Sequence, residues 1–367
     1  MSKLTLLDLF AGCGGLSYGL SKAGFHSVAA NEFQKVFTES FAANHKESEV
    51  IQGDITSSVV FSKLKTFKGK IDMISGGPPC QGFSTIGSKI EKDPRNKLFY
   101  AMMDLAAHIE PKIIFFENVS GFKRMYEGRA FNALLKELEK MGYELPCPPQ
   151  VIDAADYGAP QHRLRTIIIA FRKGIEADFS FPVATHSNED NLFNKKILPN
   201  LTVEEALSDL PQIQSGEKGT EYVTGPNNMF QEAMRKGAPA KLLYHEAPEH
   251  GEHLMEVMSY VKRGGTILDV PKNLRPKSYF ANTYARLLPD APAPTMTRNF
   301  GTPSSSRCIH PYVNRGLTTR EGARLQTFPD KYIFHGSRSE KNLQIGNAVP
   351  PALATAIGKA IIKSITR

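Results

Sequence analysis

One cysteine stands where a thiol could act as a nucleophile. Cys80 lies in the run GGPPCQGFS at residues 76–84, directly after the apolar residues 71–75. The prolines fix the backbone on one side of Cys80 and the glycines permit close approach, which a thiol that only packs does not require. Because a thiolate attacks once its pKa is lowered, this run predicts nucleophilic catalysis by Cys80.

Charged and polar residues flank two further apolar stretches. Glu117 and Asn118 follow one of them, and Arg163 and Arg165 precede another. Alternate residues of an extended segment point the same way, so we expect the two arginines to share a face. Taken singly, each charge is more typical of a surface ion pair. Beside Cys80 at converging strand ends, the set predicts a catalytic site.

A glycine-rich turn follows the first apolar stretch. Residues 8–15 read DLFAGCGG and precede a helical pattern, so a ligand could approach the backbone and meet free N–H groups. A merely tight turn is the plainer interpretation, and a dehydrogenase would need G-x-G-x-x-G seated for a pyrophosphate. Asp8, ahead of the glycines, would repel a diphosphate and suits an ammonium group instead.

Two more carboxylates follow the next strand patterns. Glu32 comes 24 residues after Asp8, where a carboxylate can bind both hydroxyls of a ribose. Asp54 could accept a hydrogen bond from an adenine amino group. A nucleoside that carries an amino acid fits all three carboxylates, so these residues predict S-adenosyl-L-methionine. Phe10 and Phe33 either flank the adenine or belong to the core.

Alternating strands and helices must position these residues. Short apolar runs predict buried strands at residues 4–9, 28–31, 71–75, 113–117 and 166–171. Helical spacing predicts helices over 98–109 and 131–141, the second ended by Gly142. The expected fold class is therefore α/β, a doubly wound, mostly parallel sheet whose ligands lie beyond the carboxyl ends of its strands.

The alternation stops after residue 172. The mixed sequence that follows predicts a second, smaller domain. Thr202 and Glu205 fit a capping box that opens a helix over 203–210, and a helical pattern from Pro350 must dock on the first domain. The expected division is a first domain at 1–175, a second with its hinge at 176–335, and a returning segment at 336–367.

Composition limits the class of protein. With 367 residues, 41% hydrophobic and 22% charged, the chain is typical of a globular protein rather than a disordered, collagen-like or coiled-coil one. The longest apolar run, residues 167–171, is far too short to cross a bilayer, and Asp8 interrupts the first run, so we expect neither a membrane span nor secretion. Four scattered cysteines without a C-x-x-C pair indicate a reducing compartment.

Together the motifs resemble those of the DNA (cytosine-5) methyltransferase family. Six occur in the family's order: DLFAGCGG (8–15), GGPPCQGFS (76–84), ENV (117–119), QHRLR (161–165), RGLTTREGARLQTFPD (315–330) and QIGNAVPP (344–351). The middle third carries no diagnostic motif, and none is expected in the family's variable target-recognition region. The chain departs from the pattern at His162, a variable position, and beside Glu32, where Phe33 replaces the tryptophan of many members.

The resemblance implies an enzyme that flips its target cytosine out of the duplex. Cys80 would attack C6, Glu117 would hold or donate the proton at N3, and Arg165 would bind O2. Arg163 and Asn118 would belong to the same catalytic group.

The resemblance also implies a cofactor site for S-adenosyl-L-methionine, with S-adenosyl-L-homocysteine as product and no metal. In the family, the Asn347 motif packs beside the glycine turn, and Leu98 lies near the methionine part of the cofactor. The expected cofactor residues are Asp8, Phe10, Ala11, Gly12, Gly14, Gly15, Glu32, Phe33, Asp54, Ile55, Pro78, Leu98 and Asn347.

Charge predicts where double-stranded DNA would bind. The net charge is +8, but residues 201–260 carry 4 Lys or Arg against 10 Asp or Glu, whereas residues 261–300 carry 7 against 2. Phosphate contacts should therefore concentrate in the later stretch. The expected contacts are Ser84, Lys262, Arg263, Lys272, Arg275, Lys277 and Arg298.

Other functions stay open as alternatives. A tRNA cytosine-5 methyltransferase could use the same scaffold, although a recognition region as long as residues 172–286 favours duplex DNA. A non-catalytic relative would be expected to lack Cys80 or the glycine turn. A metal cluster between His245 and His253 is disfavoured by Pro248 and Gly251, which interrupt a rigid helical site.

The resemblance indicates a stand-alone enzyme of the prokaryotic or phage type. We expect a monomer in the prokaryotic cytoplasm or nucleoid, without membrane attachment. It would act in a restriction-modification system or as an orphan modification enzyme, and a cognate restriction endonuclease would act separately. Its base-reading side chains depend on loop geometry.

Overall fold

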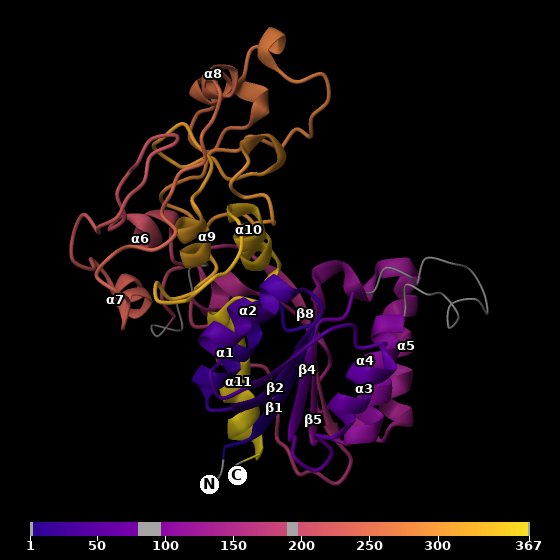
Figure 1. The fold of residues 1–367 in the computed structure, drawn as a ribbon. Coiled ribbons are helices and arrows are strands. Elements are labelled where there is room, and N and C mark those ends of the chain that lie inside the picture. Colours follow the sequence, from indigo (N-terminus) through magenta and orange to yellow (C-terminus); the bar gives the residue numbers. More distant parts are fainter. Residues whose placement is uncertain (1–2, 80–96, 189–196, 366–367) are drawn as a thin grey trace. The chain divides into compact units, whose positions relative to one another are not determined.

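The computed structural model describes residues 3–79, 97–188 and 197–365, and the chain forms two compact units. Unit 1 consists of Met1–Asp153, Leu164–Val183 and Leu353–Arg367, and unit 2 consists of Ala154–Arg163 and Ala184–Ala352. Figure 1 shows the chain with its elements labelled.

An eight-stranded sheet forms the centre of unit 1. Its strand order is β3-β2-β1-β4-β5-β8-β6, and β7 also pairs with β8. Neighbours among β1 to β5 run parallel, whereas β8 runs antiparallel to β5, β6 and β7. This confirms the expected mostly parallel α/β sheet. The strands are β1 (Thr5–Leu9), β2 (His26–Glu32), β3 (Glu49–Gln52), β4 (Met73–Gly76), β5 (Ile113–Val119), β6 (Tyr143–Glu144), β7 (Gln150–Asp153) and β8 (Leu164–Arg172).

Helices cover both faces of this sheet, as a doubly wound fold requires. One face carries α3, α4 and α5, and the other carries α1, α2 and α11 (Figure 1). The helices are α1 (Gly15–Ala23), α2 (Lys35–Asn44), α3 (Ser58–Lys65), α4 (Lys97–Ile109), α5 (Arg129–Lys140) and α11 (Pro351–Ile365), with the 3-10 helices η2 (Ser120–Lys123) and η3 (Met125–Gly128) before α5.

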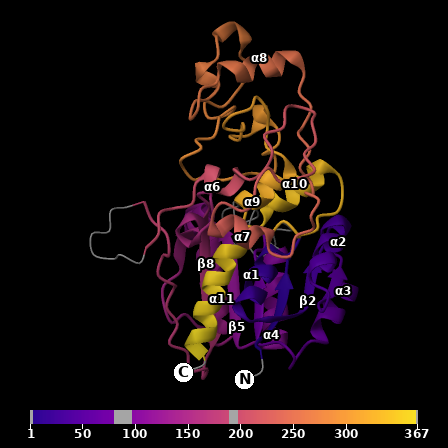
Figure 2. The same ribbon diagram turned by 90° about the vertical axis from the view of Figure 1, so that its left-hand side faces the viewer.

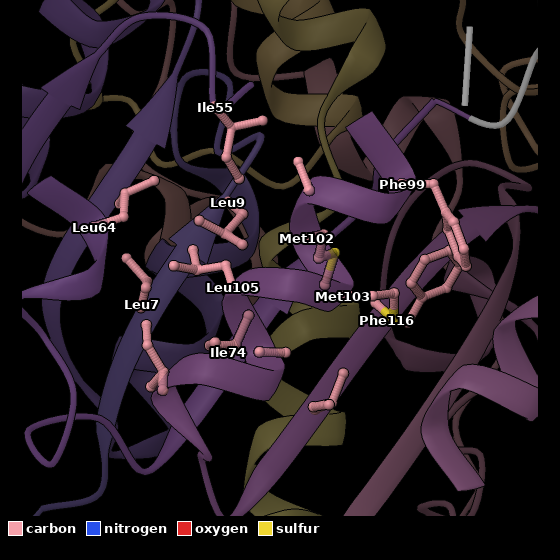
Figure 3. Packing of buried hydrophobic residues seen from close by; sticks show 14 of the residues in the cluster. Leu7, Leu9, Ile55, Leu64, Ile74, Phe99, Met102, Met103, Leu105 and Phe116 are labelled. Atoms are coloured by element: carbon pink, nitrogen blue, oxygen red, sulfur yellow. The ribbon is translucent and has the colours of Figure 1, made fainter. Parts of the chain in front are cut away.

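The core of unit 1 lies between the sheet and α4. Figure 3 shows Leu7, Leu9 and Ile74 of the strands beside Met102 and Leu105 of α4, and all five side chains are fully buried. The helical spacing of apolar residues over 98–109 predicted this face of α4. Such close packing fixes the strands, so the residues at their ends have defined positions.

The helix α11 docks on unit 1 against α1, as expected (Figure 2). Thr355 Oγ1 donates a 3.0 Å hydrogen bond to Gly19 O of α1. A Cβ at Gly358 would lie 2.7 Å from the Cβ of Ala23, so glycine is required for the helices to approach this closely. Because α1 follows the glycine turn, α11 supports the element on which that turn is built.

Residues 338–365 contain a stretch that is long and apolar enough to cross a membrane, by length and composition only. They form two helices, α10 (Arg338–Asn347) and α11 (Pro351–Ile365), rather than one. Leu353, Ile357 and Ile361 of α11 are fully buried within the protein. Internal packing therefore accounts for the apolar face of α11.

Unit 2 consists of short helices and loops, with no sheet among the residues that the structure describes. Thr202 and Glu205 form the predicted capping box, which opens α6, although α6 ends at Leu207 rather than at residue 210. The helices are α6 (Val203–Leu207), α7 (Met229–Arg235), α8 (Glu252–Tyr260), α9 (Thr319–Leu325) and α10 (Arg338–Asn347), with 3-10 helices η4 (Ala154–Tyr157), η5 (Ile267–Asp269), η6 (Lys272–Leu274) and η7 (Pro303–Ser305).

The returning segment is shorter than expected. Residues 336–352 belong to unit 2, and the chain rejoins unit 1 only at Leu353. Gln326 Nε2 donates to Ile345 O at 2.8 Å and to Ala348 O at 2.7 Å, which holds the end of α10 in unit 2. A helical pattern in the sequence identified the returning segment, but the hydrogen bonds of Gln326 decide that the part before Leu353 packs in unit 2.

Buried arginines hold unit 2 together in place of a sheet. Arg324 donates to the two oxygens of Asp330 at 2.9 and 2.6 Å and also bonds Asp209. Arg315 donates two 2.8 Å hydrogen bonds to Glu321. All five side chains are at most 1% exposed. Removing one partner from such a pair leaves an uncompensated buried charge.

Replacing Arg324 by methionine should therefore destabilise unit 2 strongly. We expect chemical denaturation to show a loss of about 3–5 kcal/mol in the free energy of unfolding. Lys63→Met is the matched control, because the 2.9 Å Lys63–Glu49 ion pair is half exposed. Its loss should cost less than about 1 kcal/mol. Equal losses in the two variants would contradict the role given to Arg324.

Candidate active site

The carboxyl ends of the parallel strands meet at one edge of the sheet in unit 1. Leu9 of β1 pairs with Gly76 of β4, and Gly76 pairs with Phe116 of β5, so β1 and β4 end together while β5 continues to Val119 at the same edge. In sheet order, this edge carries Asp54 after β3, Glu32 in β2, the glycine turn after β1, residues 77–79 after β4 and Glu117 in β5. The chain changes winding direction between β1 and β4, which is where open α/β sheets bind ligands.

The glycine turn is folded around the carboxylate of Glu32. Gly12 N–H donates to Glu32 Oε2 and Gln34 N–H donates to Oε1, both at 2.9 Å. Gly14, with a φ of 96°, begins α1 without a side-chain cap. The turn thus presents a carboxylate beside an open helix N-terminus, where backbone N–H groups can meet a ligand.

A buried histidine that the sequence analysis missed supports this turn. A Cβ at Gly14 would lie 2.5 Å from His45 Nε2, so the imidazole lies directly against the glycine. The ring stacks on Phe41 with centroids 4.2 Å apart, and burial lowers the pKa of His45 to about 4. At neutral pH an uncharged ring therefore supports Gly14. Its sequence signal, a lone histidine just after a helix, is too common to single out.

Asp8 lies beneath the turn rather than at its surface. Its carboxylate is 1% exposed and accepts hydrogen bonds from Ser17 Oγ at 2.6 Å and Ser75 Oγ at 2.5 Å. Burial raises the pKa of Asp8 to about 6, although both hydroxyls oppose this shift. The expectation that Asp8 presents an open carboxylate to an ammonium group is corrected, because these bonds fasten α1 and β4 to β1.

The residues that follow β2 and β3 differ in how exposed their side chains are. Asp54 is exposed, and its Oδ1 accepts from Thr56 N–H and Oγ1, both at 2.8 Å, whereas Ile55 is buried. Phe33 is 67% exposed, while Phe10, with a φ of 54°, is partly buried against the core. Phe33 is therefore a surface ring rather than a core residue, and Asp54 is held in a fixed turn.

Glu117 and Arg165 form an ion pair at the same edge. Arg165 Nε lies 2.7 Å from Glu117 Oε1, and their side chains are 12% and 13% exposed. The antiparallel pairing of β5 with β8 brings them together, since Val119 lies opposite Arg165 and Glu117 is two residues away. A Cβ at Gly77 would lie 2.6 Å from Glu117 Oε2. The glycine after β4 therefore leaves the space that the carboxylate occupies.

Asn118 fixes the backbone that leads to Cys80. Its Nδ2 donates to Pro78 O at 3.0 Å, and its Oδ1 accepts from Val119 N–H at 2.9 Å. Cys80 and Ser84 lie outside the described residues. The described chain thus fixes the approach to the predicted nucleophile up to residue 79.

The three cysteines that the structure describes lack the lowered pKa that a nucleophile needs. Burial raises the pKa of Cys13 and Cys308 to about 12, and it also raises the pKa of Cys147. A thiol that keeps its proton is a poor nucleophile. Among the four cysteines, Cys80 stays the candidate.

Arg163 does not share the surroundings of Arg165, contrary to expectation. It belongs to unit 2, is 1% exposed, and donates to Met296 O at 2.9 Å and Gly346 O at 2.7 Å. The strand β8 begins only at Leu164, so the alternation behind that expectation does not reach Arg163. These contacts give Arg163 a packing role in unit 2 instead of a place beside Arg165.

Comparison with known proteins extends the sequence motifs to nearly the whole chain. A family model described as C-5 cytosine-specific DNA methylase matches residues 4–363. Type II methyltransferase M1.HphI of Haemophilus parahaemolyticus is 34% identical over 99% of this chain and 88% of its own length, and M.DdeI of Desulfomicrobium norvegicum is 36% identical over 98% and 88%. A solved DNA modification methyltransferase from an Escherichia coli prophage matches with a TM-score of 0.79 and 28% identity over 100% of both chains.

The chain belongs to the C-5 cytosine-specific DNA methylase family. It is a DNA (cytosine-5) methyltransferase, whose reaction adds a methyl group to carbon 5 of cytosine in DNA. The match spans the middle third as well as the six motifs, so the family does not rest on the catalytic segments alone.

Leu98 and Asn347, which are expected cofactor residues of this DNA methyltransferase, lie on α4 and α10. Leu98, the second residue of α4, is partly buried against the core of unit 1. Asn347 is the exposed last residue of α10 in unit 2. Their contact with the cofactor stays a prediction.

Most of the expected DNA contacts in unit 2 have exposed side chains. The exposed ones are Lys262, Arg263, Lys272, Lys277 and Arg298. Arg275 differs, because its Nε donates to Val270 O and its Nη2 donates to Leu268 O, both at 2.7 Å. This corrects its expected role, since the guanidinium binds carbonyls of its own loop rather than lying open to a phosphate.

Among the residues that the structure describes, no group of three His, Cys, Asp or Glu side chains could hold a metal ion. His245, from the segment weighed as a metal cluster, instead bonds Thr318 Oγ1 at 3.0 Å and Pro211 O at 2.8 Å. It connects three segments of unit 2.

Asp8→Asn should flatten the pH dependence of stability. The pKa of Asp8 in the folded state, about 6, exceeds the ordinary value of 3.8. The contribution of Asp8 to the free energy of unfolding is therefore complete below about pH 4 and is lost as the pH rises through 6. A pKa shift of this size corresponds to a change of about 3 kcal/mol in the free energy of unfolding. Denaturation from pH 4 to 8 should show this loss in the wild type and not in the variant, which stays neutral. Parallel pH profiles would contradict a buried, titrating Asp8.

Gly77→Ala should impair catalysis without impairing cofactor binding. The added methyl group would displace the Glu117 carboxylate, and a misplaced catalytic group should lower kcat for DNA methylation by about 10-fold or more. Gly121→Ala is the matched control, because a Cβ there meets nothing within 4 Å. Similar kcat values for the two variants would argue against the role given to Gly77.

Proposed function

We propose that this DNA methyltransferase uses S-adenosyl-L-methionine and forms a covalent bond between Cys80 and C6 of a cytosine flipped out of a specific duplex sequence. The Glu117–Arg165 ion pair carries the proposal. It lies against Gly77, at the end of β4, the strand that neighbours the one bearing the glycine turn. The Glu117 carboxylate of this pair therefore lies beside the backbone that leads to Cys80.

The residues after β1, β2 and β3 fit this cofactor. Glu32 offers a carboxylate for ribose hydroxyls, Asp54 offers an exposed one for the adenine amino group, and Phe33 offers an exposed ring face. The uncapped N-terminus of α1 at Gly14 offers backbone N–H groups for a carboxylate. When bound, the cofactor supplies a methyl group on positively charged sulfur, and S-adenosyl-L-homocysteine is the product.

Cys80 acts as the nucleophile. Its thiolate adds to C6 of the cytosine, which makes C5 electron-rich and able to accept the methyl group. A base then takes the proton from C5, the C5–C6 double bond re-forms, and the sulfur of Cys80 leaves as thiolate. The target cytosine must first leave the helix stack, which costs a few kcal/mol.

Glu117 and Arg165 stabilise the charge that this attack creates. Electron density moves toward N3 and O2 of the ring as sulfur adds to C6. Glu117 holds or donates the proton at N3, and the Arg165 guanidinium donates to O2. Because both side chains are largely buried, they interact more strongly with the developing charge than they would in water.

Unit 2 supplies the target-recognition surface in this proposal. The net charge of +5 over residues 261–300, from 7 basic and 2 acidic residues, supports phosphate contacts there. The type II names of the relatives support a role in restriction-modification or as an orphan modification enzyme. The enzyme acts as a monomer in the prokaryotic cytoplasm or nucleoid, and any cognate restriction endonuclease acts separately.

Cys80→Ala should abolish methyl transfer while the protein still binds labelled cofactor, because the thiol acts on cytosine only. Bisulfite sequencing of DNA from cells that express the wild type should reveal methylated cytosines within one short sequence. Cys147→Ala is the matched control and should retain activity, since burial raises the pKa of this thiol. Normal turnover by Cys80→Ala would refute the covalent mechanism.

Duplex DNA and total tRNA, offered separately with labelled cofactor, test the substrate class. We expect label in DNA. Label in tRNA alone would refute the proposed substrate and leave the tRNA alternative.

A further inference from the structure

The imidazole ring of His45 lies against both ends of the first turn of α1. A Cβ at Gly14 would lie 2.5 Å from His45 Nε2, and the Tyr18 ring meets the imidazole edge-on with centroids 6.3 Å apart. Tyr18 N–H donates to Gly14 O at 2.8 Å, which is the first hydrogen bond of the helix. The imidazole therefore contacts the two residues that define where α1 begins.

The imidazole is itself held by the core of unit 1 and by a different helix. Phe41 is fully buried and packs with Ala11 and Ala30, and its ring stacks on the imidazole with centroids 4.2 Å apart. His45 N–H donates to Phe41 O at 2.9 Å at the end of α2. Such close packing leaves the ring little freedom. The position of Gly14 therefore depends on a ring that α2 fixes in place.

The contact between His45 and Gly14 is made by an uncharged ring. Burial lowers the pKa of His45 to about 4, although a hydrogen bond with the backbone of Gly14 opposes this shift. A positive charge next to the N-terminus of a helix is unfavourable, because that end carries the positive end of the helix dipole. A neutral imidazole supports the turn without this cost.

His45 and Tyr18 also line a cavity of about 400 Å³. The cavity is bordered by α1, the end of α2 and the start of β2, where Ser21, Lys22 and His26 contribute to its lining. Removal of the imidazole would join the space of the ring to this cavity. A small planar molecule could then enter and take the place of the ring.

We infer that His45 is a positioning residue for the cofactor, because its ring holds Gly14 and the N-terminus of α1 ready for the carboxylate of S-adenosyl-L-methionine. The inference rests on the proposed function, in which these backbone N–H groups meet that carboxylate. A turn that is ordered before binding loses less entropy when the cofactor binds. His45 therefore sets the affinity for the cofactor, whereas Glu117 and Arg165 act on the cytosine.

His45→Ala tests this role through binding of S-adenosyl-L-homocysteine, measured by calorimetry on the full chain. We expect the dissociation constant to rise about 10-fold or more, because the turn must then become ordered during binding. At saturating cofactor, kcat for DNA methylation should fall less than about twofold, since the residues that act on cytosine are unchanged. His45→Gln, which also lacks the ring, is the second variant and should weaken binding in the same direction.

Free imidazole should restore cofactor binding to His45→Ala, since the space of the lost ring opens into the cavity. The experiment is done above the ordinary imidazole pKa of about 6.5, where the added molecule is neutral. His26→Ala is the matched control, because His26 lines the same cavity but pairs with Glu47 at 3.7 Å. Its affinity for the cofactor should equal that of the wild type, with or without imidazole.

Leu138→Ala separates positioning from stability. Leu138 of α5 is fully buried in the core of unit 1, on the face of the sheet opposite α1 (Figure 1). This variant should unfold at a lower temperature and still bind the cofactor with wild-type affinity. An equal loss of affinity in Leu138→Ala and His45→Ala would overturn the inference. A dissociation constant of His45→Ala within about twofold of the wild type, or one that imidazole leaves unchanged, would also overturn it.

The inference and the proposed function fail in different ways. A wild type that binds no S-adenosyl-L-homocysteine refutes the proposed cofactor site. A wild type that binds it, together with a folded His45→Ala that binds it equally well, refutes the role of His45 and leaves the proposed function standing.

Discussion

The parallel pairing of β1 with β2 on one side and with β4 on the other is the constraint on which the site depends. It places the carboxyl ends of these strands at one edge, so Glu32, the glycine turn and the segment leading to Cys80 become neighbours. The buried layer of α4 keeps the strands in register. Asp8, bonded to Ser17 and Ser75, ties the turn to both flanking elements.

The reversed direction of β8 is the second requirement. An antiparallel strand brings its amino end to the edge where β5 brings its carboxyl end, so Arg165 can reach Glu117 over 2.7 Å. A parallel strand would have carried Arg165 to the opposite edge of the sheet. The Glu117–Arg165 pair therefore depends on one change of strand direction. It also depends on Gly77, which leaves room for the Glu117 carboxylate.

Unit 2 solves a different physical problem, because it has no sheet in its described part to satisfy its backbone. Buried arginines satisfy backbone carbonyls and carboxylates there instead. Arg286 donates to several carbonyls, and Arg324 joins Asp209 to Asp330. Several motif residues that identify the family, Arg315 to Asp330, thus serve the fold of unit 2. Lys262, Lys272 and Lys277 of unit 2 are exposed instead.

The sequence by itself determined five of the eight strands, the helices α4, α5 and α11, the capping box at Thr202 and the family, because hydrophobic period, cap chemistry and ordered motifs are local properties of the chain. It also brought Glu117 and Arg165 into one site. Only the tertiary structure decided what each charged side chain bonds. Asp8, Arg163 and Arg275 occupy positions where sequence favours a ligand, yet serines or carbonyls bind them. Those partners come from distant or folded-back segments, and no local pattern encodes such contacts, so His45 beneath Gly14 could be found only in the folded chain.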